Sequence, residues 1–245
     1  MKSAYTKSIV KIRSVENGRT DFGTGFIIDY IDDSTYIVTC AHVINAVGGI
    51  NNVRIGDYPD EVEVIAIGDS AAFDVAVLKI SRQFEKNTAL RVCLCNEEAE
   101  KFTICGWNRI AEHFTITSIC GRLTLYGEIE ENNLRTEAYK FEVEDRSENL
   151  LKPGYSGAPV INEKNDCVAG IVFMEHKEGQ EGICISINSV IQICPELYNL
   201  ISKSELELRN KKLSRLLAYK MKIEQEVQNE EEQIKVLQSK LSYSS

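Results

Sequence analysis

Residues 152–161 read KPGYSGAPVI, a loop-like stretch in which Ser156 is flanked by glycines just before an apolar run. Glycine permits backbone angles that other residues avoid, so Gly154 and Gly157 suit a tight turn that exposes the serine hydroxyl. A hydroxyl is a poor nucleophile until a base accepts its proton. The stretch is therefore a nucleophile loop only if the chain also supplies a histidine and an acid; otherwise it is an ordinary turn between strands.

A histidine and an aspartate stand upstream of this loop, each beside a strand-like run. His42 follows the run 36–39, and Asp74 directly precedes the apolar run 75–80. The chain order is therefore His, Asp, Ser, the order of the chymotrypsin type of triad rather than of the subtilisin or α/β-hydrolase types. Asp69 is the competing acid, but no apolar run follows it, which favours a solvated turn residue.

Four segments in this order resemble the chymotrypsin/trypsin-like serine proteases, and the short bacterial trypsin-like peptidases more closely than the secreted digestive enzymes. They read GTGFII at 23–28, IVTCAHVI at 37–44, DVAVLKI at 74–80 and GYSGAPV at 154–160. The resemblance covers roughly residues 5 to 195. It implies an all-β fold of two six-stranded antiparallel barrels, with the active site in the cleft between them and no metal or cofactor.

The resemblance also assigns roles. His42 is expected to act as general base and then general acid, since an imidazole changes charge near neutral pH. Asp74 is expected to fix the tautomer of His42 and stabilise its charged form, and Ser156 to be the nucleophile. The backbone amides of Gly154 and Ser156 map to the oxyanion hole of the family.

Two neighbours of the serine depart from the family pattern. Ala158 stands where a glycine is more usual, which leaves the loop geometry open. Tyr155 stands where zymogen-type members have an aspartate that pairs with a newly cleaved N-terminus. That activation route is therefore absent, and regulation by a partner, a conformational change or assembly is expected instead.

The resemblance places the substrate pocket at Leu150, Phe173 and Gly182. Leucine at the pocket floor disfavours a basic residue at the cleavage site and favours an apolar one. Glu148 and Glu175 would reverse this preference if their side chains reach the pocket. A role in the core or in a loop is the open alternative for all of these residues.

Composition excludes other classes of function. The chain has 28 basic and 37 acidic side chains and a net charge of -9, which argues against a nucleic-acid or anionic-membrane partner. The first residues lack the apolar stretch of a signal peptide and no later run could span a membrane, so the sequence predicts a cytoplasmic protein.

In a reducing compartment the eight cysteines would form no disulfides, and they are interpreted as mostly buried thiols. Cys93, Cys95 and Cys105 lack the further ligands of a zinc site, so no metal is expected.

Before residue 195 the apolar signal comes in short β-branched runs separated by turn residues, which is typical of an all-β barrel or sandwich. We expect a protease domain at 1–200, with its first barrel at about 1–90 and its second at about 100–195. The expected strands are 8–12, 25–31, 36–39, 62–67, 75–80, 102–105, 123–126, 141–143, 160–161, 168–173 and 183–187.

The character of the chain changes after Pro195, where glycine and proline vanish and leucines alternate with charged residues. If Leu206 is position a of a heptad, eight of the eleven a and d positions up to Leu241 are apolar. We therefore predict a C-terminal helix at 201–245 that forms a coiled coil, although Lys220 and Glu230 on the seam weaken that reading. The 36 residues from Leu206 to Leu241 would span roughly 54 Å, which is longer than one barrel needs. The segment 203–241 is therefore expected to reach a second copy or a partner protein. A helix folded back along its own barrels is the alternative.

The leading hypothesis is an intracellular serine endopeptidase that acts on a protein or peptide through an acyl-enzyme on Ser156. A catalytically silent, protease-like binding module or scaffold is the alternative from another class, motivated by Ala158 and the missing export signal. A third hypothesis differs only in regulation: a protease gated by a partner in a multi-protein stress or defence system. The sequence names neither the substrate and cleavage preference nor the oligomeric state and activating signal.

Overall fold

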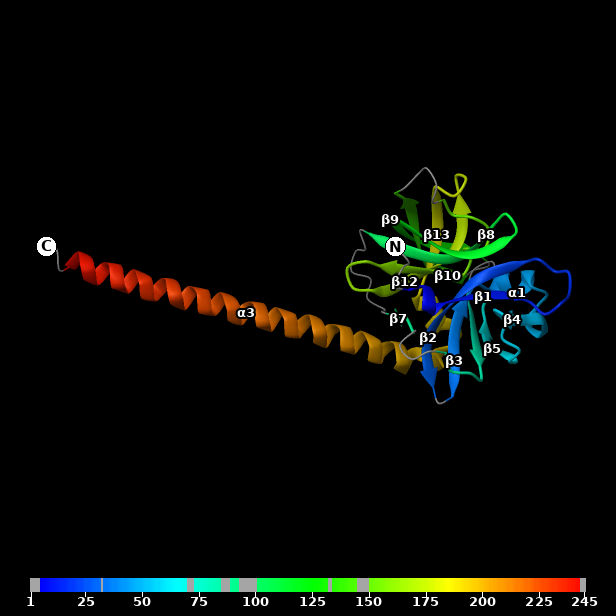
Figure 1. Ribbon diagram of the computed structural model, residues 1–245, viewed down its shortest axis with the longest axis horizontal. Coiled ribbons are helices and arrows are strands. Elements are labelled where there is room, and N and C mark those ends of the chain that lie inside the picture. Colours follow the sequence, from blue (N-terminus) through cyan, green and yellow to red (C-terminus); the bar gives the residue numbers. More distant parts are fainter. Residues whose placement is uncertain are drawn as a thin grey trace. The chain divides into compact units, whose positions relative to one another are not determined.

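The computed structural model describes residues 5–31, 33–69, 73–84, 89–92, 101–131, 134–144 and 150–242 (Figure 1). The packing of the backbone divides the chain into two units, residues 1–204 and 205–245. The first unit contains the strands and the second consists of most of one long helix. Each unit is described by itself.

The first unit is built mainly of antiparallel strands. They are β1 (Ile9–Ser14), β2 (Phe22–Ile31), β3 (Ser34–Thr39), β4 (Val53–Ile55), β5 (Val62–Ile67), β6 (Ala76–Ile80), β7 (Arg91–Val92), β8 (Phe102–Ile110), β9 (His113–Glu131), β10 (Leu134–Val143), β11 (Pro159–Asn162), β12 (Cys167–His176) and β13 (Glu181–Ser186). The short helices are α1 (Ala41–Ala46) and α2 (Asn188–Ile193), with 3₁₀ turns η1 (Thr6–Ser8), η2 (Ile50–Asn52) and η3 (Pro195–Leu197).

The first sheet has six strands in the order β4-β1-β2-β3-β6-β5. Its strands are antiparallel, with Ile9 opposite Phe26 and Ile37 opposite Leu78. The side chains of Ile12, Phe26, Ile37 and Leu78 are fully shielded from solvent. Since β-branched and aromatic side chains fit a pleated surface that is buried on one face, these residues both form the strands and supply the core.

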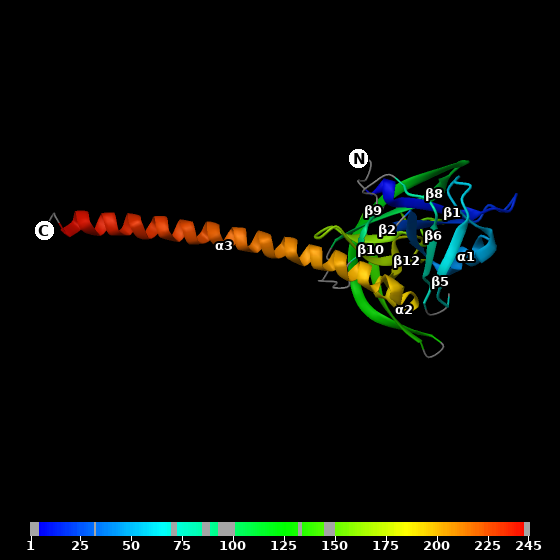
Figure 2. The same ribbon diagram turned by 90° about the horizontal axis from the view of Figure 1, so that it is seen from below.

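The second sheet follows the order β11-β8-β9-β10-β13-β12-β7, and β11 also pairs with β12. This additional ladder closes six of the strands into a ring, to which β7 adds in parallel through Arg91 and Val92. Inside the ring, the rings of Phe102 and Phe141 meet edge to face with their centroids 5.2 Å apart. Figures 1 and 2 show the two sheets side by side in the first unit.

The predicted all-β unit followed by a long helix is confirmed. The finer prediction of two six-stranded barrels is met in part. Six strands of the second sheet close into a ring with a seventh strand added, and the first sheet has six strands. Within the described ranges, no ladder joins β4 to β5, the outer strands of the first sheet.

Helix α3 (Tyr198–Ser242) is one continuous helix of 45 residues. Its first turn belongs to the first unit, where Ile201 is buried in the same core as Leu197 and Val190. In the described part of the chain, no helix is both long and apolar enough to cross a membrane. Five of the six cysteines described as free are buried, as expected; Cys93 and Cys95 lie outside the described residues.

Candidate active site

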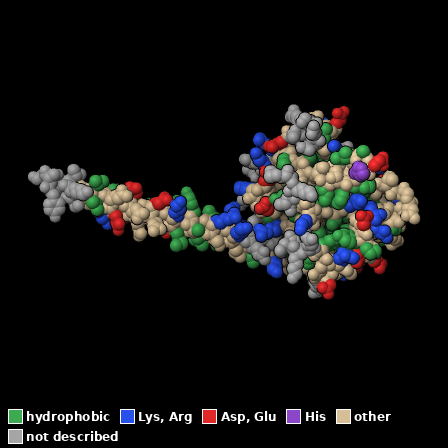
Figure 3. Space-filling view, viewed as in Figure 1, with side chains coloured by type: hydrophobic (Ala, Val, Ile, Leu, Met, Phe, Trp, Pro, Cys, Tyr) green, Lys and Arg blue, Asp and Glu red, His purple; other side chains and the backbone are tan. Residues whose placement is uncertain are grey.

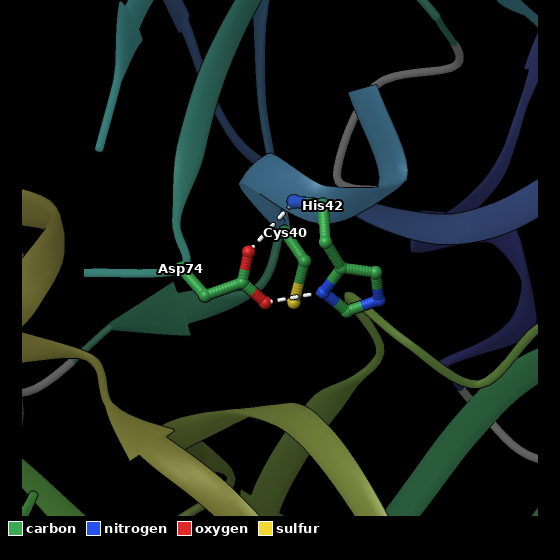
Figure 4. Close-up of side chains that lie close together, drawn as sticks. All are labelled: Cys40, His42 and Asp74. Atoms are coloured by element: carbon green, nitrogen blue, oxygen red, sulfur yellow. Dashed lines mark hydrogen bonds and ion pairs between the residues drawn. The ribbon is translucent and has the colours of Figure 1, made fainter. Parts of the chain in front are cut away.

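His42 lies in the first turn of α1, directly after strand β3, and is bound twice by Asp74 (Figure 4). The backbone amide of His42 donates to Asp74 Oδ1 at 2.7 Å, and His42 Nδ1 forms a hydrogen bond with Oδ2. The Asp74 side chain is 1% exposed, whereas that of His42 is 38% exposed. A carboxylate only accepts hydrogen bonds, so in the neutral imidazole the tautomer that fits carries its proton on Nδ1 and has a lone pair on Nε2. The imidazole is therefore held with Nε2 directed away from Asp74 (Figure 4).

Asp74 is positioned by the turn between β5 and β6. The amide of Gly68 donates to Val75 O at 2.8 Å, and a Cβ at Gly68 would lie only 2.0 Å from Phe73 O. This close approach turns the chain so that Asp74 enters the buried space beside α1. The competing acid, Asp69, is exposed in the same turn, so the structure brings Asp74 and not Asp69 to the histidine.

Cys40 is a third member of this cluster that sequence reasoning missed. Its thiol is fully buried and donates to Val172 O at 3.2 Å, and its sulfur lies within 4.8 Å of the nearest ligand atoms of His42 and Asp74. Burial, together with the nearby Asp74 carboxylate, raises the pKa of the Cys40 thiol. A protonated thiol and a carboxylate already bonded to the imidazole fit a hydrogen-bonded cluster better than a metal site.

The nucleophile loop begins with a tight turn. The amide of Tyr155 donates to Lys152 O at 3.2 Å, with Pro153 second in the turn and Gly154 third at φ +105°. Proline followed by a residue with positive φ is the signature of a type II turn. Gly154 is therefore required by its backbone angle, and the turn leads directly into Ser156.

The loop belongs to the second sheet but is bonded to the first. The amide of Thr24 on β2 donates to Ser156 O at 2.9 Å, and the Thr24 hydroxyl donates to Gly154 O at 2.6 Å. Gly157 has φ +85°, and a Cβ there would lie 2.0 Å from Thr24 O and 3.2 Å from the amide nitrogen of Cys40. The Ser156 loop is thus fixed against β2 and against Cys40, which follows β3 and precedes the helix that carries His42.

The two amides of the expected oxyanion hole are available for a ligand. Among the residues that the structure describes, none accepts a hydrogen bond from the amide of Gly154 or Ser156, whereas the amides of Tyr155, Gly157 and Ala158 all have backbone acceptors. Donors left unpaired at a turn can stabilise a negative oxygen. Ser156 itself is half-buried.

The buried side chain of Tyr155 anchors the loop in the second sheet. This side chain is 2% exposed, and its ring packs so closely on Gly106 that a Cβ there would lie 2.5 Å from the ring. The Tyr155 hydroxyl forms a hydrogen bond with the hydroxyl of Thr117 on β9. Burial raises the pKa of the Tyr155 hydroxyl, which stays neutral. A neutral aromatic side chain thus holds the loop at the position where zymogen-type members have a charged pair.

Ala158 fits its place without distortion. It is fully buried, its amide donates to Tyr155 O at 2.8 Å, and its carbonyl accepts from Val172 at 2.9 Å. It is not among the described residues with positive φ. The backbone here does not require a glycine.

The residues expected in the substrate pocket lie on three segments. Phe173 occupies a bulge of β12, and its ring centroid lies 6.3 Å from that of His42. A Cβ at Gly182 would meet the side chain of Leu151 at 2.8 Å, whereas Leu150 lies beside Gly179. The structure therefore brings Phe173 to the histidine and packs Leu151, which sequence reasoning missed, against Gly182. Glu148 lies outside the described residues, as does the side chain of Glu175.

Comparison with known proteins places this geometry in context. A family model described as the trypsin-like peptidase domain matches residues 23–171. No curated protein matches the chain.

Several solved proteases share the fold. The active form of the Rv3671c protease from M. tuberculosis is 24% identical, with a TM-score of 0.55 and coverage of 78% of this chain and 80% of that one. Deg5 is 20% identical, with a TM-score of 0.56 over 79% of this chain and 90% of that one. The serine endoprotease from Yersinia pestis is 18% identical, with a TM-score of 0.52 over 80% and 67% of the two chains. At these identities the likeness concerns the fold alone.

Proposed function

The chain belongs to the trypsin-like peptidase domain family, and on that premise we propose that it is a serine endopeptidase that cleaves peptide bonds through an acyl-enzyme on Ser156. The single observation that carries the proposal is the pairing of His42 in α1 with the buried Asp74, together with the hydrogen bond that joins the Ser156 loop to Thr24 on β2.

In the first step, Ser156 Oγ attacks the scissile carbonyl carbon while His42 Nε2 accepts the hydroxyl proton. Asp74 holds the other ring nitrogen and stabilises the charged imidazole. The negative oxygen of the tetrahedral intermediate is bound by the amides of Gly154 and Ser156, each worth roughly 3 kcal/mol to the transition state.

Collapse of the intermediate breaks the C–N bond, and His42 returns its proton to the leaving amine. Water then enters, gives a proton to His42 and attacks the ester carbonyl. The C–O bond to Ser156 breaks, the serine regains its proton, and the acid product leaves. The cycle uses no metal and no cofactor.

We assign the protease domain to residues 1–200, with the two sheets as its barrels at about 1–90 and 100–195, and the helix to 201–245. Phe173 beside His42, Leu151 against Gly182 and Leu150 beside Gly179 support a preference for an apolar residue at the cleavage site. The buried free thiols support a cytoplasmic location. Helix segment 203–241 is the proposed surface for a second copy or a partner that regulates the enzyme.

The test is cleavage of a mixed peptide library by the purified full-length chain, read by mass spectrometry. The wild type and Ser214→Ala, which alters an exposed serine of α3, should produce the same cleavages, and Ser156→Ala should produce none. Cleavage that survives Ser156→Ala would overturn the assignment. An intact chain that neither cleaves peptides nor reacts with a fluorophosphonate would instead be the silent binding module, which the regular backbone at Ala158 no longer favours.

A further inference from the structure

Taken by itself, α3 exposes a row of apolar side chains. The described apolar residues at positions a and d of the heptads are each between 41% and 60% exposed. They are Leu206, Leu213, Leu216, Ile223, Val227, Ile234 and Leu237. An apolar stripe that recurs every three to four residues is the seam of a coiled coil, and it is stable in water only when another surface covers it.

The charges in the middle of α3 are separated along its length. Residues 209–222 carry six basic and no acidic side chains, and residues 223–233 carry five acidic and no basic ones. Along the helix in Figure 3, blue side chains gather on the part nearer the strands and red ones farther toward its free end. Two copies that run in opposite directions would therefore bring unlike charges together, whereas parallel copies would bring like charges together.

The residues at positions a and d also favour antiparallel over parallel pairing. In a parallel pair, each a or d residue faces its own copy, so Arg209, Lys220 and Glu230 would each meet a like charge. In an antiparallel pair, position a faces position d. A two-fold axis at residue 225 places Lys220 opposite Glu230 of the second copy.

The same register matches the apolar residues. It pairs Leu213 with Leu237, Leu216 with Ile234, and Ile223 with Val227, and symmetry repeats each pair. All the seam layers from 213 to 237 are then either apolar or a Lys–Glu pair. A register shifted by one heptad instead places Leu213 opposite Glu230 and Lys220 opposite Ile223, which buries both charges against apolar side chains.

We propose that α3 pairs with α3 of a second copy as an antiparallel two-stranded coiled coil over residues 213–237, with Lys220 of each chain opposite Glu230 of the other. The paired segment is roughly 36 Å long at 1.5 Å per residue. Within one chain, Lys220 lies 3.6 Å from Glu224, and both are well exposed, so Lys220 can turn to the second copy at little cost. The proposal deepens the partner surface proposed for 203–241 and does not depend on peptidase chemistry.

The test is sedimentation of the full-length chain over a range of concentrations. The wild type should show twice the 27.6 kDa mass of one chain. Lys220→Glu places like charges at both symmetry-related layers and should weaken dimerisation about tenfold or more, as should Glu230→Lys. The double variant Lys220→Glu/Glu230→Lys restores the pair and should restore the dimer. Lys222→Glu and Glu232→Lys make the same charge changes off the seam and should leave it unaltered.

Other arrangements predict different results. In a parallel pair, Lys220→Glu replaces one like-charge contact with another, so the dimer would not weaken and the double variant would rescue nothing. A helix covered by its own protease unit gives a monomer at every concentration. Either result overturns the proposal, provided that circular dichroism shows the helix intact. Fluorophosphonate labelling of Ser156 in the same samples reports separately on the proposed function.

Discussion

The two halves of the candidate site are held by different forces. His42 and Asp74 belong to the part of the fold built on the first sheet, and two hydrogen bonds join His42 to the buried carboxylate of Asp74. The Ser156 loop comes from the second sheet and is held by backbone bonds, close glycine contacts and the buried ring of Tyr155. His42 is thus oriented by hydrogen bonds to a carboxylate, and the Ser156 loop by close packing.

This difference predicts how each half fails. Removing a charge from the first half should abolish chemistry and leave the packing almost unchanged. Adding a single methyl group to the second half should disturb the fold itself, because no room exists for it. The site therefore offers variants that separate catalysis from stability.

Of the variants that compare the two halves of the site, Asp74→Asn should have the largest effect on activity. The amide nitrogen would face His42 Nδ1 and favour the tautomer whose Nε2 carries the proton, which cannot accept one from Ser156. We expect kcat to fall about 10⁴-fold at neutral pH. Steady-state hydrolysis of a peptide ester measures it. Asp69→Asn, in the exposed part of the same turn, should leave kcat unchanged; a comparable loss in both variants would contradict the assignment of Asp74.

Gly157→Ala should instead lower the stability of the fold. Its φ of +85° and the 2.0 Å approach to Thr24 O leave no place for a methyl group. We expect a loss of about 3 kcal/mol in the free energy of unfolding, from backbone strain and overpacking together. Urea unfolding measures it, with Gly127→Ala as the matched control, since a Cβ at Gly127 meets nothing within 4 Å. Equal stability of the two variants would show that the loop does not dock as described.

Tyr155→Phe should have the smallest effect. It keeps the ring but removes the hydroxyl that bonds Thr117, so stability should fall by about 1 kcal/mol. The double variant Tyr155→Phe/Thr117→Val should cost less than the sum of the single variants, because both remove the same bond. Thermal unfolding checks this, with Tyr219→Phe on the exposed face of α3 as the control. Strictly additive losses would mean that the bond contributes nothing to holding the loop.

The sequence predicted the parts of the fold that carry a local signal. Strands such as β3 and β6 are β-branched runs, and they were found. Short β4 and β7 were not predicted, and the long β9 was expected only at 123–126. Many of its remaining residues are polar or exposed, and the strand runs through them because β8 and β10 pair with β9 along its length.

The same limit applies to the site. Asp74 and Ser156 stand in short motifs that point to their chemistry, and so does His42. The contacts that hold them, from Cys40 to Val172 and from Thr24 to Gly154, join residues more than 100 positions apart. No local pattern records such a pair, so these partners are visible only in the folded chain.

The central claim is that Ser156 is a nucleophile activated by His42. Peptide mapping of the intact protein after brief reaction with a fluorophosphonate tests it most directly. We predict a single adduct on Ser156 in the wild type and almost none on the same serine in His42→Ala. An adduct on another serine, or undiminished labelling of Ser156 without the imidazole, would contradict it.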